Sequence, residues 1–311
     1  MEARPLIARR DGNQEDEMKL LVVHGEGLGN IVEALPLLRT LDKAGIEADL
    51  FLARATSEFS RDFLKGRRVY LEGDAVDDES YDGKIETIWG NVQGRSQSLS
   101  GIKTVNDLAK QTMRLDTSEV DVYLNAARDL GIKEDAFEYD CRDELNTVLP
   151  EKTYDVVFAN GYNWRVAANR WEMKSYPRFT ELAQELLREG KSVCSVGAPH
   201  EHIEGTENET ARPLAETCGL LKAAKVVVST DSGVYHCACA LGIPTVVIFT
   251  FTGIRKNYDK RFHQSAEIIR VPVDCHSDCH AKMKWMKCDR DVCRDIPVKI
   301  VMEAIRRQYA V

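Results

Sequence analysis

The fold class follows from VVVSTDSGVYH, residues 226–236. The three consecutive valines at its start predict a buried strand, because β-branched side chains favour an extended backbone. The next residues, Asp231-Ser232-Gly233, form a turn signal, and a helix of small residues follows at Cys237–Leu241. A buried strand that runs through a tight turn into a helix is half of a βαβ unit, so this stretch predicts a parallel sheet and an α/β fold.

The same turn is a candidate site for a phosphate group. Backbone N–H groups at the start of a helix lack partners within the helix, and the helix dipole favours negative charge there. Asp231 and Ser232 also suit an ordinary helix N-cap, and His236, one turn further on, also suits a packed core position. This stretch alone leaves the binding role and the purely structural role open.

Strand and helix signals of the same kind recur on both sides of this stretch. The chain has 311 residues, too many for one ordinary core, which predicts two domains. We expect a disordered extension at 1–17, a first domain at 18–149 and a second domain at 150–311, whose last helix can pack back on the first domain. The expected strands are Leu20–Val23, Ala48–Ala53, Lys84–Trp89, Tyr154–Ala159, Ser192–Val196, Lys225–Ser229 and Thr245–Thr250. The expected helices are Ile31–Ala44, kinked at Pro36, and Arg178–Glu189.

Composition limits the classes of function. The chain is 43% hydrophobic and 30% charged, and no apolar run is long enough to cross a bilayer. Its formal net charge of −8 gives no basic field for a nucleic-acid backbone, so we expect no nucleic-acid partner. The first residues lack the apolar core of a signal peptide, so we expect a cytoplasmic protein with reduced cysteines.

Two further segments lie near the ends of expected strands. Lys174-Ser175-Tyr176-Pro177 precedes an amphipathic helix, and Gly197-Ala198-Pro199-His200-Glu201 follows a strand. Ligands of open α/β sheets bind at the carboxyl ends of the strands. We therefore expect both segments to converge on the turn at Asp231.

In this order the motifs resemble those of glycosyltransferase family nine, the heptosyltransferases of lipopolysaccharide assembly. The resemblance covers nearly all of the chain after Met18. It is carried by Gly27-Leu28-Gly29-Asn30, Leu35-Pro36-Leu37-Leu38-Arg39, the helical stretch Glu119–Ile132, Lys174-x-Tyr-Pro, Gly197–Glu201, Asp231-Ser-Gly-x-x-His and Leu241-Gly242-Ile243-Pro244. The resemblance implies a GT-B fold, in which two Rossmann-like domains with parallel sheets face a central cleft. It also implies that the domain at 18–149 binds the acceptor and that the domain at 150–311 binds the nucleotide sugar.

The resemblance also implies an activity: inverting, metal-independent transfer of a sugar, heptose above all, from an ADP-sugar to a hydroxyl acceptor. The acceptor would be a glycan, a lipid-linked sugar or a protein, and lipopolysaccharide biosynthesis would bring peripheral contact with the inner membrane. By resemblance, the donor-binding residues are Lys174 on the diphosphate, Glu201 on the adenosine ribose, Asp231 on sugar hydroxyls, and Ser232, Gly233 and His236 around the phosphates. The charges agree, because Lys174 and a helix dipole offset leaving-group charge whereas an anionic Asp231 would repel it.

The catalytic base departs from the family pattern. Inverting transfer needs a group that takes the proton of the acceptor hydroxyl. In the family this group is an aspartate directly after the glycine of the first loop, but here Asn30 follows Gly29. An amide is not a general base at neutral pH, so Glu26 is the candidate base and His24 the second candidate. Asn30 itself suits the N-cap of a helix that starts at Ile31.

Two other functions stay open at this point. The missing aspartate fits a catalytically weak nucleotide-sugar-binding protein. A dinucleotide-dependent oxidoreductase is the other alternative, because Gly25-Glu26-Gly27-Leu28-Gly29 follows a strand. Its spacing is G-x-G-x-G instead of G-x-G-x-x-G, and no acid ends the second strand at Ala53-Arg54, which disfavours a nicotinamide cofactor.

Four of the nine cysteines cluster near the end of the chain. Their spacing, C-x₃-C-x₈-C-x₄-C, is irregular for a zinc ribbon, but four thiols this close together predict one structural metal ion, zinc or iron. The proposed ligands are Cys275, Cys279, Cys288 and Cys293. Heptosyltransferases that act on autotransporter proteins resemble this chain in a C-x₃-C iron site. His276 or His280 can take the place of one of these ligands. The alternative to a metal site is a set of free, buried cysteines.

Overall fold

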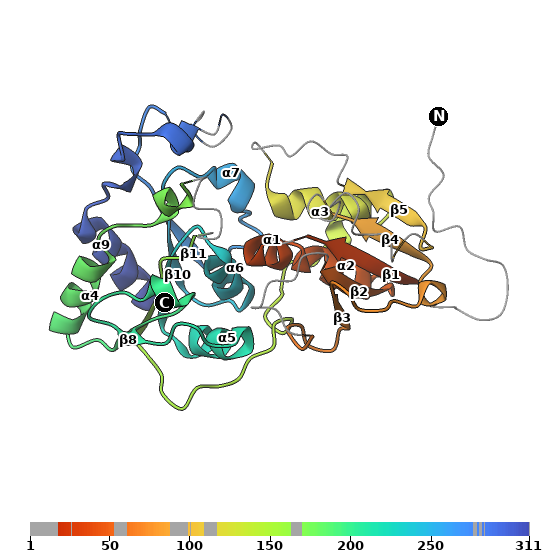
Figure 1. Cartoon of the computed structure of the whole chain (residues 1–311), viewed down its shortest axis with the longest axis horizontal. Coiled ribbons are helices and arrows are strands. Elements are labelled where there is room, and N and C mark those ends of the chain that lie inside the picture. Colours follow the sequence, from red (N-terminus) through yellow and green to blue (C-terminus); the bar gives the residue numbers. More distant parts are fainter. Residues whose placement is uncertain are drawn as a thin grey trace. The chain divides into compact units, whose positions relative to one another are not determined.

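The computed structural model describes residues 18–25, 27–52, 61–87, 99, 101–108, 117–162, 170–275, 279, 282 and 284–310. The chain forms two compact units, Met1–Glu144 and Leu145–Val311 (Figure 1). The expected domain boundary lay between residues 149 and 150. The extension expected at 1–17 lies outside the described residues. Each unit is built around a parallel sheet, as the α/β prediction requires.

The sheet of the first unit has the strand order β3-β2-β1-β4-β5, and all its neighbours pair in parallel. Its strands are β1 (Lys19–His24), β2 (Glu47–Leu52), β3 (Val69–Leu71), β4 (Gly83–Glu86) and β5 (Thr104–Asp107). The register of β1 on β2 runs from Lys19 opposite Glu47 to His24 opposite Leu52. This order, in which the chain winds outward from a central first strand, is that of doubly wound nucleotide-binding folds.

The helices of the first unit differ from the prediction at one place. They are α1 (Leu28–Glu33), α2 (Leu35–Lys43) and α3 (Glu119–Asp129), with 3₁₀ turns at Asp78–Ser80 and Glu134–Ala136. The single helix expected at Ile31–Ala44 with a kink at Pro36 is two helices, separated at Ala34. Pro36 lies in the first turn of α2, where its missing N–H group has no helical partner to lose.

The sheet of the second unit has the order β11-β10-β9-β6-β7-β8 and is parallel throughout. The strands are β6 (Val156–Ala159), β7 (Val193–Ser195), β8 (Glu207–Asn208), β9 (Val226–Thr230), β10 (Thr245–Ile248) and β11 (Ala266–Ile269). The helices are α4 (Phe179–Arg188), α5 (Leu214–Ala223), α6 (Gly233–Ala240), α7 (Ile254–Asn257) and α9 (Val298–Tyr309). Short 3₁₀ helices cover Trp171–Lys174, Pro199–Glu201, Lys284–Lys287 and Val292–Arg294.

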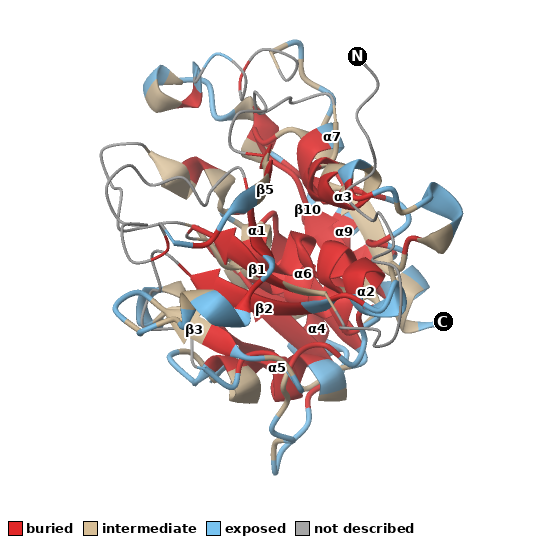
Figure 2. Cartoon of the chain, turned by 90° about the vertical axis from the view of Figure 1, so that its right-hand side faces the viewer, coloured by how far each residue is buried: buried red, intermediate tan, exposed pale blue. Residues whose placement is uncertain are grey.

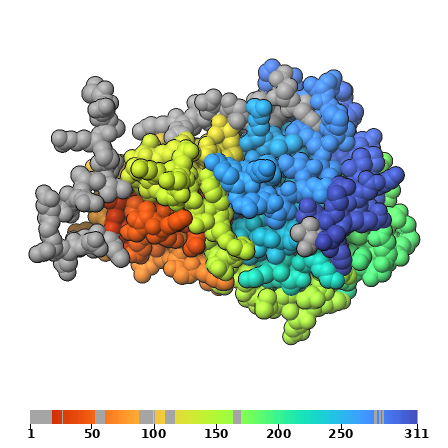
Figure 3. Space-filling model, turned by 180° about the vertical axis from the view of Figure 1, so that it is seen from behind, coloured from red at the N-terminus to blue at the C-terminus, as the bar shows by residue number. Residues whose placement is uncertain are grey.

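Helices cover both faces of the second sheet. On one face, α4 and α9 pack against β6, β9 and β10 through side chains such as Phe158, Phe179 and Val301. On the other face, α6 packs through Tyr235 and Cys239 against β10. Buried residues concentrate in the strands and in the helix sides that face them (Figure 2), while the outer side of α9 lies on the surface of its unit (Figure 3). None of the helices in the described residues is both long and apolar enough to cross a membrane.

The start of the second unit depends on one glycine of α5. The backbone of Val148 lies along this helix, and its N–H group donates to the carbonyl of Ala215 at 2.9 Å. A Cβ atom at Gly219 would lie 1.7 Å from the carbonyl oxygen of Val148, which is far inside van der Waals contact. Only glycine therefore fits at this crossing.

We predict that Gly219→Ala lowers the free energy of unfolding by about 1–3 kcal/mol, because the backbone at Val148 must move away from α5. Chemical denaturation would measure this change. Lys222→Ala, at an exposed position of the same helix, is the matched control and should stay within about 0.5 kcal/mol of wild type. Equal stability of the Gly219 and Lys222 variants would contradict the close approach.

Candidate functional site

The centre of the site in the second unit is a buried ion pair. Asp231 follows β9, and its side chain is 3% exposed. The ammonium group of Lys174 lies 3.4 Å from its Oδ2 atom, and the amide of Asn257 donates to the same oxygen at 2.7 Å. Lys174 ends the 3₁₀ helix that begins at Trp171. The structure thus brings together the Lys174 loop and the Asp231 turn, which we expected from the sequence to converge.

The charges around Asp231 keep it ionised. Burial alone would raise the pKa of its carboxyl group, but Lys174, His236 and Lys256, together with a hydrogen bond from Thr252, lower it to about 2. At neutral pH the site therefore contains a buried carboxylate held by a lysine. A carboxylate with this arrangement can accept hydrogen bonds from neutral hydroxyl groups, while the lysine can bind an anion.

Helix α6 starts beside this ion pair. No side chain caps the first backbone N–H groups of the helix. Ser232 is the N-cap residue, with an extended backbone at φ −145°, but its side chain makes no capping hydrogen bond. Its hydroxyl group lies 3.1 Å from that of Ser229 instead. Asp231 is likewise engaged with Asn257 and Lys174 and not with the helix. The start of α6, at Gly233, is therefore available to an anion in the way that the phosphate interpretation requires.

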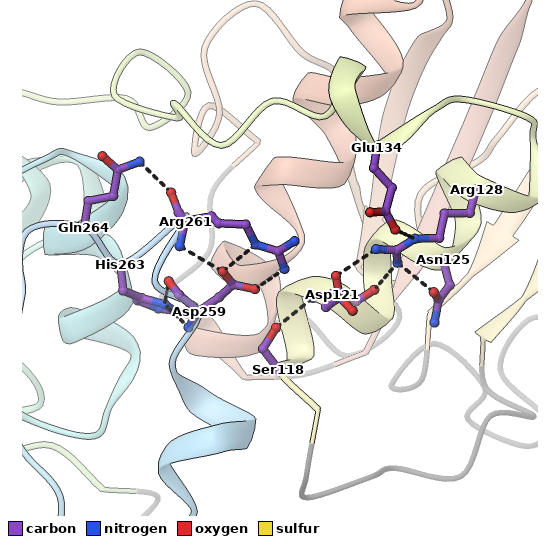
Figure 4. Close-up of polar contacts among 9 residues, drawn as sticks. All are labelled: Ser118, Asp121, Asn125, Arg128, Glu134, Asp259, Arg261, His263 and Gln264. Carbon is purple, nitrogen blue, oxygen red and sulfur yellow. Dashed lines mark hydrogen bonds and ion pairs between the residues drawn. The ribbon is translucent and has the colours of Figure 1, made fainter.

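His236 lies in the first turns of α6 and is held in one orientation. Its Nε2 atom lies 3.8 Å from Oδ1 of Asp231, and its Nδ1 atom lies 2.9 Å from Nε2 of His263. The backbone N–H of Asp259 donates to Nδ1 of His263 at 2.9 Å, and Arg261 pairs with the Asp259 carboxylate (Figure 4). Burial, then the proximity of His236, lowers the pKa of His263 well below its usual range. A neutral His263 with its hydrogen on Nε2 donates to His236, so the hydrogen of His236 stands on Nε2, towards Asp231.

Glu201 lies close to the start of α6. Its carboxylate accepts hydrogen bonds from the backbone N–H groups of Ala198 at 3.0 Å and Tyr162 at 3.3 Å. Gly161, just after β6, lies between Glu201 and Ser232. A Cβ atom at Gly161 would lie 3.2 Å from the Cβ atom of Ser232 and 3.6 Å from Oε1 of Glu201. The side chain of Glu201 is 8% exposed, so it is buried at the carboxyl edge of the sheet and is not a solvated surface carboxylate.

In the first unit, the prediction that Asn30 caps a helix is wrong. Helix α1 begins at Leu28, with Gly27 as its N-cap, because the φ of 104° at Gly27 lets the chain turn into the helix earlier than expected. Asn30 therefore lies inside α1, and its Nδ2 atom donates to Oε1 of Glu119 at 2.5 Å. Glu26, the candidate base, lies outside the described residues.

Glu119 is a site residue that the sequence reasoning missed. It is the first residue of α3 and only 1% exposed, and it also accepts a hydrogen bond from the hydroxyl of Tyr123. That hydroxyl lies 3.1 Å from Nε2 of His24, at the end of β1. Burial lowers the pKa of His24 to about 4, against a smaller opposing effect of Glu119, so His24 is neutral at pH 7. In the sequence Glu119 has the pattern of an ordinary first-turn acid after the N-cap Ser118, with no sign of burial.

A second polar network, which includes Asp121 and Arg128, lies along the same helix (Figure 4). The hydroxyl of Ser118 accepts the N–H of Asp121 at 3.0 Å, as an N-cap. Arg128 pairs with Asp121 at 2.9 Å and with Glu134 at 2.8 Å. These contacts stabilise α3, at whose first turn Glu119 lies, and join the helix to the 3₁₀ turn that follows it.

The four clustered cysteines lie near one another in the second unit. Cys279 and Cys293 are buried against Met173, Phe251 and Trp285. Burial, followed by the neighbouring thiols, raises the pKa of Cys293 to about 11 and that of Cys279 in the same direction. Among the described residues, no three of the cysteine sulfurs gather within 4.8 Å, so a metal ion would have to draw them together. A bound cation would also reverse their pKa shift, since thiolates are the metal ligands.

Comparisons with known proteins agree with this architecture. Solved structures that resemble the chain include a glycosyltransferase family 9 protein from Veillonella parvula, with 14% identity, a TM-score of 0.69 and coverage of 96% of this chain and 99% of that one. ADP-heptose lipopolysaccharide heptosyltransferase II of E. coli has 18% identity, a TM-score of 0.65 and coverage of 94% and 99%. The iron-containing dodecameric glycosyltransferase TibC of enterotoxigenic E. coli has 15% identity, a TM-score of 0.64 and coverage of 95% and 77%.

These likenesses establish the fold, which is the GT-B fold with two parallel-sheet α/β domains. No curated protein sequence matches the chain significantly. The sequence model of glycosyltransferase family 9 (heptosyltransferase) matches residues 107–288, more than half of the chain. The chain therefore belongs to glycosyltransferase family 9, and it is a glycosyltransferase.

Proposed function

We propose that this enzyme transfers a heptose from ADP-heptose to a hydroxyl acceptor with inversion at the anomeric carbon. The observation that carries the proposal is Lys174, whose ammonium group lies 3.4 Å from the buried Asp231 beside the start of α6. A cation and uncapped amides suit a diphosphate, and a buried carboxylate suits sugar hydroxyls. In support, TibC has been solved in complex with ADP-D-β-D-heptose. In this proposal Glu201 binds the adenosine ribose.

The proposed chemistry is a single displacement. The acceptor oxygen forms a bond to the anomeric carbon as the bond from that carbon to the β-phosphate oxygen of ADP breaks, and the acceptor proton leaves to a base. Lys174 and the dipole of α6 stabilise the negative charge that develops on the leaving diphosphate. His236 points its Nε2–H group into the same region. Lys174 and the dipole of α6 supply positive charge for the departure of ADP, and His236 adds a hydrogen-bond donor, so we propose that transfer is metal-independent.

For the base we retain Glu26 as the proposed residue. Glu119 is the nearest described carboxylate to Asn30, but it is buried and already accepts hydrogen bonds from Asn30 and Tyr123. Its role in this proposal is to orient Asn30, whose Oδ1 atom can accept a hydrogen bond from the acceptor hydroxyl. The second candidate function, a weak enzyme that mainly binds nucleotide sugars, is favoured by the amide that replaces the family's aspartate at Asn30.

The cysteine cluster supports a second proposal, a structural zinc or iron ion held by Cys275, Cys279, Cys288 and Cys293. Four thiols whose negative charges would oppose one another suit a cation of this kind. TibC, which shares the fold, is described as iron-containing. The ion would fix the loops of this segment and take no part in transfer.

We predict that Lys174→Ala lowers turnover by about 10²–10³-fold, because one charge that stabilises the leaving group is lost. Release of ADP from saturating ADP-heptose, with water as the hydroxyl acceptor of the heptosyl group, would measure this. Lys299→Ala, at a position that is 85% exposed on α9, is the control and should retain wild-type turnover. Wild-type turnover in the Lys174 variant would overturn the assignment.

We predict that Asn30→Asp does not restore a base. The new carboxylate would lie about 2.5 Å from that of Glu119, where both cannot be ionised, so the folded pair retains a proton that the unfolded chain releases. Stability must then fall as pH rises, and we expect a loss of about 1–3 kcal/mol between pH 5 and pH 8. Denaturant unfolding at the two pH values measures it.

Asn125→Asp is the matched control, because Asn125 accepts a hydrogen bond from Arg128 and the new carboxylate gains a cation as partner. Its stability should not fall over the same pH range. A variant Asn30→Asp that transfers sugar faster than wild type, without added pH dependence of stability, would contradict both the shared proton and the orienting role of Glu119.

Elemental analysis of protein purified without a metal-affinity step should find about one equivalent of zinc or iron per chain, as a four-thiolate site implies. The metal should be lost from a Cys279→Ser, Cys293→Ser double variant. Cys141→Ser, which changes a buried cysteine of the first unit, should retain it. Less than about a tenth of an equivalent in the wild-type protein would rule out this site.

A further inference from the structure

The loop that carries Lys174, residues 170–177, is hydrogen-bonded to residues 285–296, which are called the C-terminal segment. Arg294 ends the 3₁₀ helix Val292–Arg294, and its side chain is 18% exposed. Its Nε atom donates to the backbone carbonyl of Ser175 at 3.0 Å, and its Nη2 atom donates to the hydroxyl of Ser175 at 2.9 Å. The planar guanidinium therefore holds the residue next to Lys174 by two parallel hydrogen bonds, a geometry that a lysine cannot reproduce.

A second arginine ties the beginning of the same loop to the same segment. Arg170 donates from Nη1 to the backbone carbonyl of Cys288 at 2.6 Å. Its backbone has a φ of 50°, in the left-handed region that non-glycine residues seldom adopt, and such conformations persist where surrounding contacts impose them. Trp171 follows, with its ring 5.3 Å from that of Trp285, and Lys174 lies 5.6 Å from the Trp171 ring.

The far side of the loop is fixed to the sheet. Asn160, just after β6, accepts the N–H of Tyr176 at 2.9 Å and donates to the Tyr176 carbonyl at 3.3 Å. The hydroxyl of Tyr176 donates to the carbonyl of Ile296 at 2.8 Å. Residues 174–176 thus lie between the end of a central strand and the C-terminal segment, with contacts on both sides.

We propose that Arg294 is a positioning residue for Lys174. It fixes the backbone at Ser175, and thereby sets where the ammonium group of Lys174 meets the diphosphate of the donor. Lysine has a long, flexible side chain, so a fixed backbone is needed to place its ammonium group. A displacement of about 1 Å at a reacting centre can lower the rate by about 100-fold. This inference rests on the proposed role of Lys174.

The test is a double-mutant cycle of Arg294→Ala and Lys174→Ala. Two quantities are measured, the Kd of ADP by calorimetry and the rate of ADP release from saturating ADP-heptose. If Arg294 acts through Lys174, we expect Arg294→Ala to weaken ADP binding by about 3–10-fold and slow release by about 10–50-fold. In the Lys174→Ala background the same change should have less than about a twofold effect, because the group that it positions is gone. A purely structural arginine would show its full effect in both backgrounds.

Arg290→Ala is the matched control. Arg290 lies on the same segment, is 52% exposed and pairs with Asp274 rather than with the loop. This variant should bind ADP and release it within about twofold of wild type. Two milder changes guard against misfolding of Arg294→Ala: Ser175→Ala removes one of the two contacts, and Arg294→Lys keeps the charge. Both should give smaller losses that also vanish in the Lys174→Ala background.

The outcomes separate this inference from the proposed function. If wild-type protein neither binds ADP nor releases it from ADP-heptose, both fail. If Lys174→Ala is impaired but the Arg294 effect is undiminished in that background, only the positioning role fails. Wild-type binding and release by Arg294→Ala would overturn it as well.

Discussion

The second unit depends on the burial of one carboxylate. An ionised carboxylate removed from water is costly unless charges and hydrogen bonds compensate for it. Asp231 receives that compensation from Lys174 and Asn257, and its pKa is about 2 because Lys174, His236 and other nearby groups outweigh the effect of burial. The consequence for binding is direct. In the proposed function, sugar hydroxyls donate to Asp231 when the diphosphate attracts Lys174, so the buried carboxylate keeps hydrogen-bond partners.

This pair forms where it does because of strand direction. In a parallel sheet the carboxyl ends of all strands lie at one edge. Gly161 follows β6 and Asp231 follows β9, while Glu201 lies in the turn after β7. None of these residues is near another in sequence. Topology alone brings them to one edge, and the absence of a side chain at Gly161 lets Ser232 and Glu201 approach from either side.

The parts that the sequence predicted are those with local signals. Apolar runs identified the central strands, and the Asp231 turn and the Lys174 loop were correctly expected to meet, because a parallel sheet leaves little alternative. The short edge strands β3, β5, β8 and β11 were missed, since strands of two to four residues carry too little periodicity. The start of α1 was misjudged because a positive φ at Gly27 leaves no trace in the pattern of side chains.

Glu119, His263 and Arg294 were missed for another reason. Each has an ordinary polar pattern in the sequence, and its importance comes from partners far along the chain: Asn30 for Glu119, and Ser175 for Arg294. His263 acts through His236, which is 27 residues away. Such pairs depend on tertiary packing, which no local spacing encodes. The resemblance to a family assigned no role to them either: His263 and Arg294 lie outside the shared motifs, and Glu119 lies in one of them without a role attached to it.

Glu119 also gives a physical reason for the asparagine that breaks the family pattern. The first unit already contains a buried carboxylate at this point, and it accepts hydrogen bonds from Asn30 and from Tyr123. An ionised aspartate in place of Asn30 would put a second negative charge within hydrogen-bond distance of the first, and one of the two would have to take up a proton. With the amide, Glu119 receives a donor instead of a competing charge. The nearby His24, with a pKa of about 4, carries no charge at neutral pH. The two positions are therefore linked: with Glu119 buried beside α1, residue 30 is better suited to donate a hydrogen bond than to accept a proton.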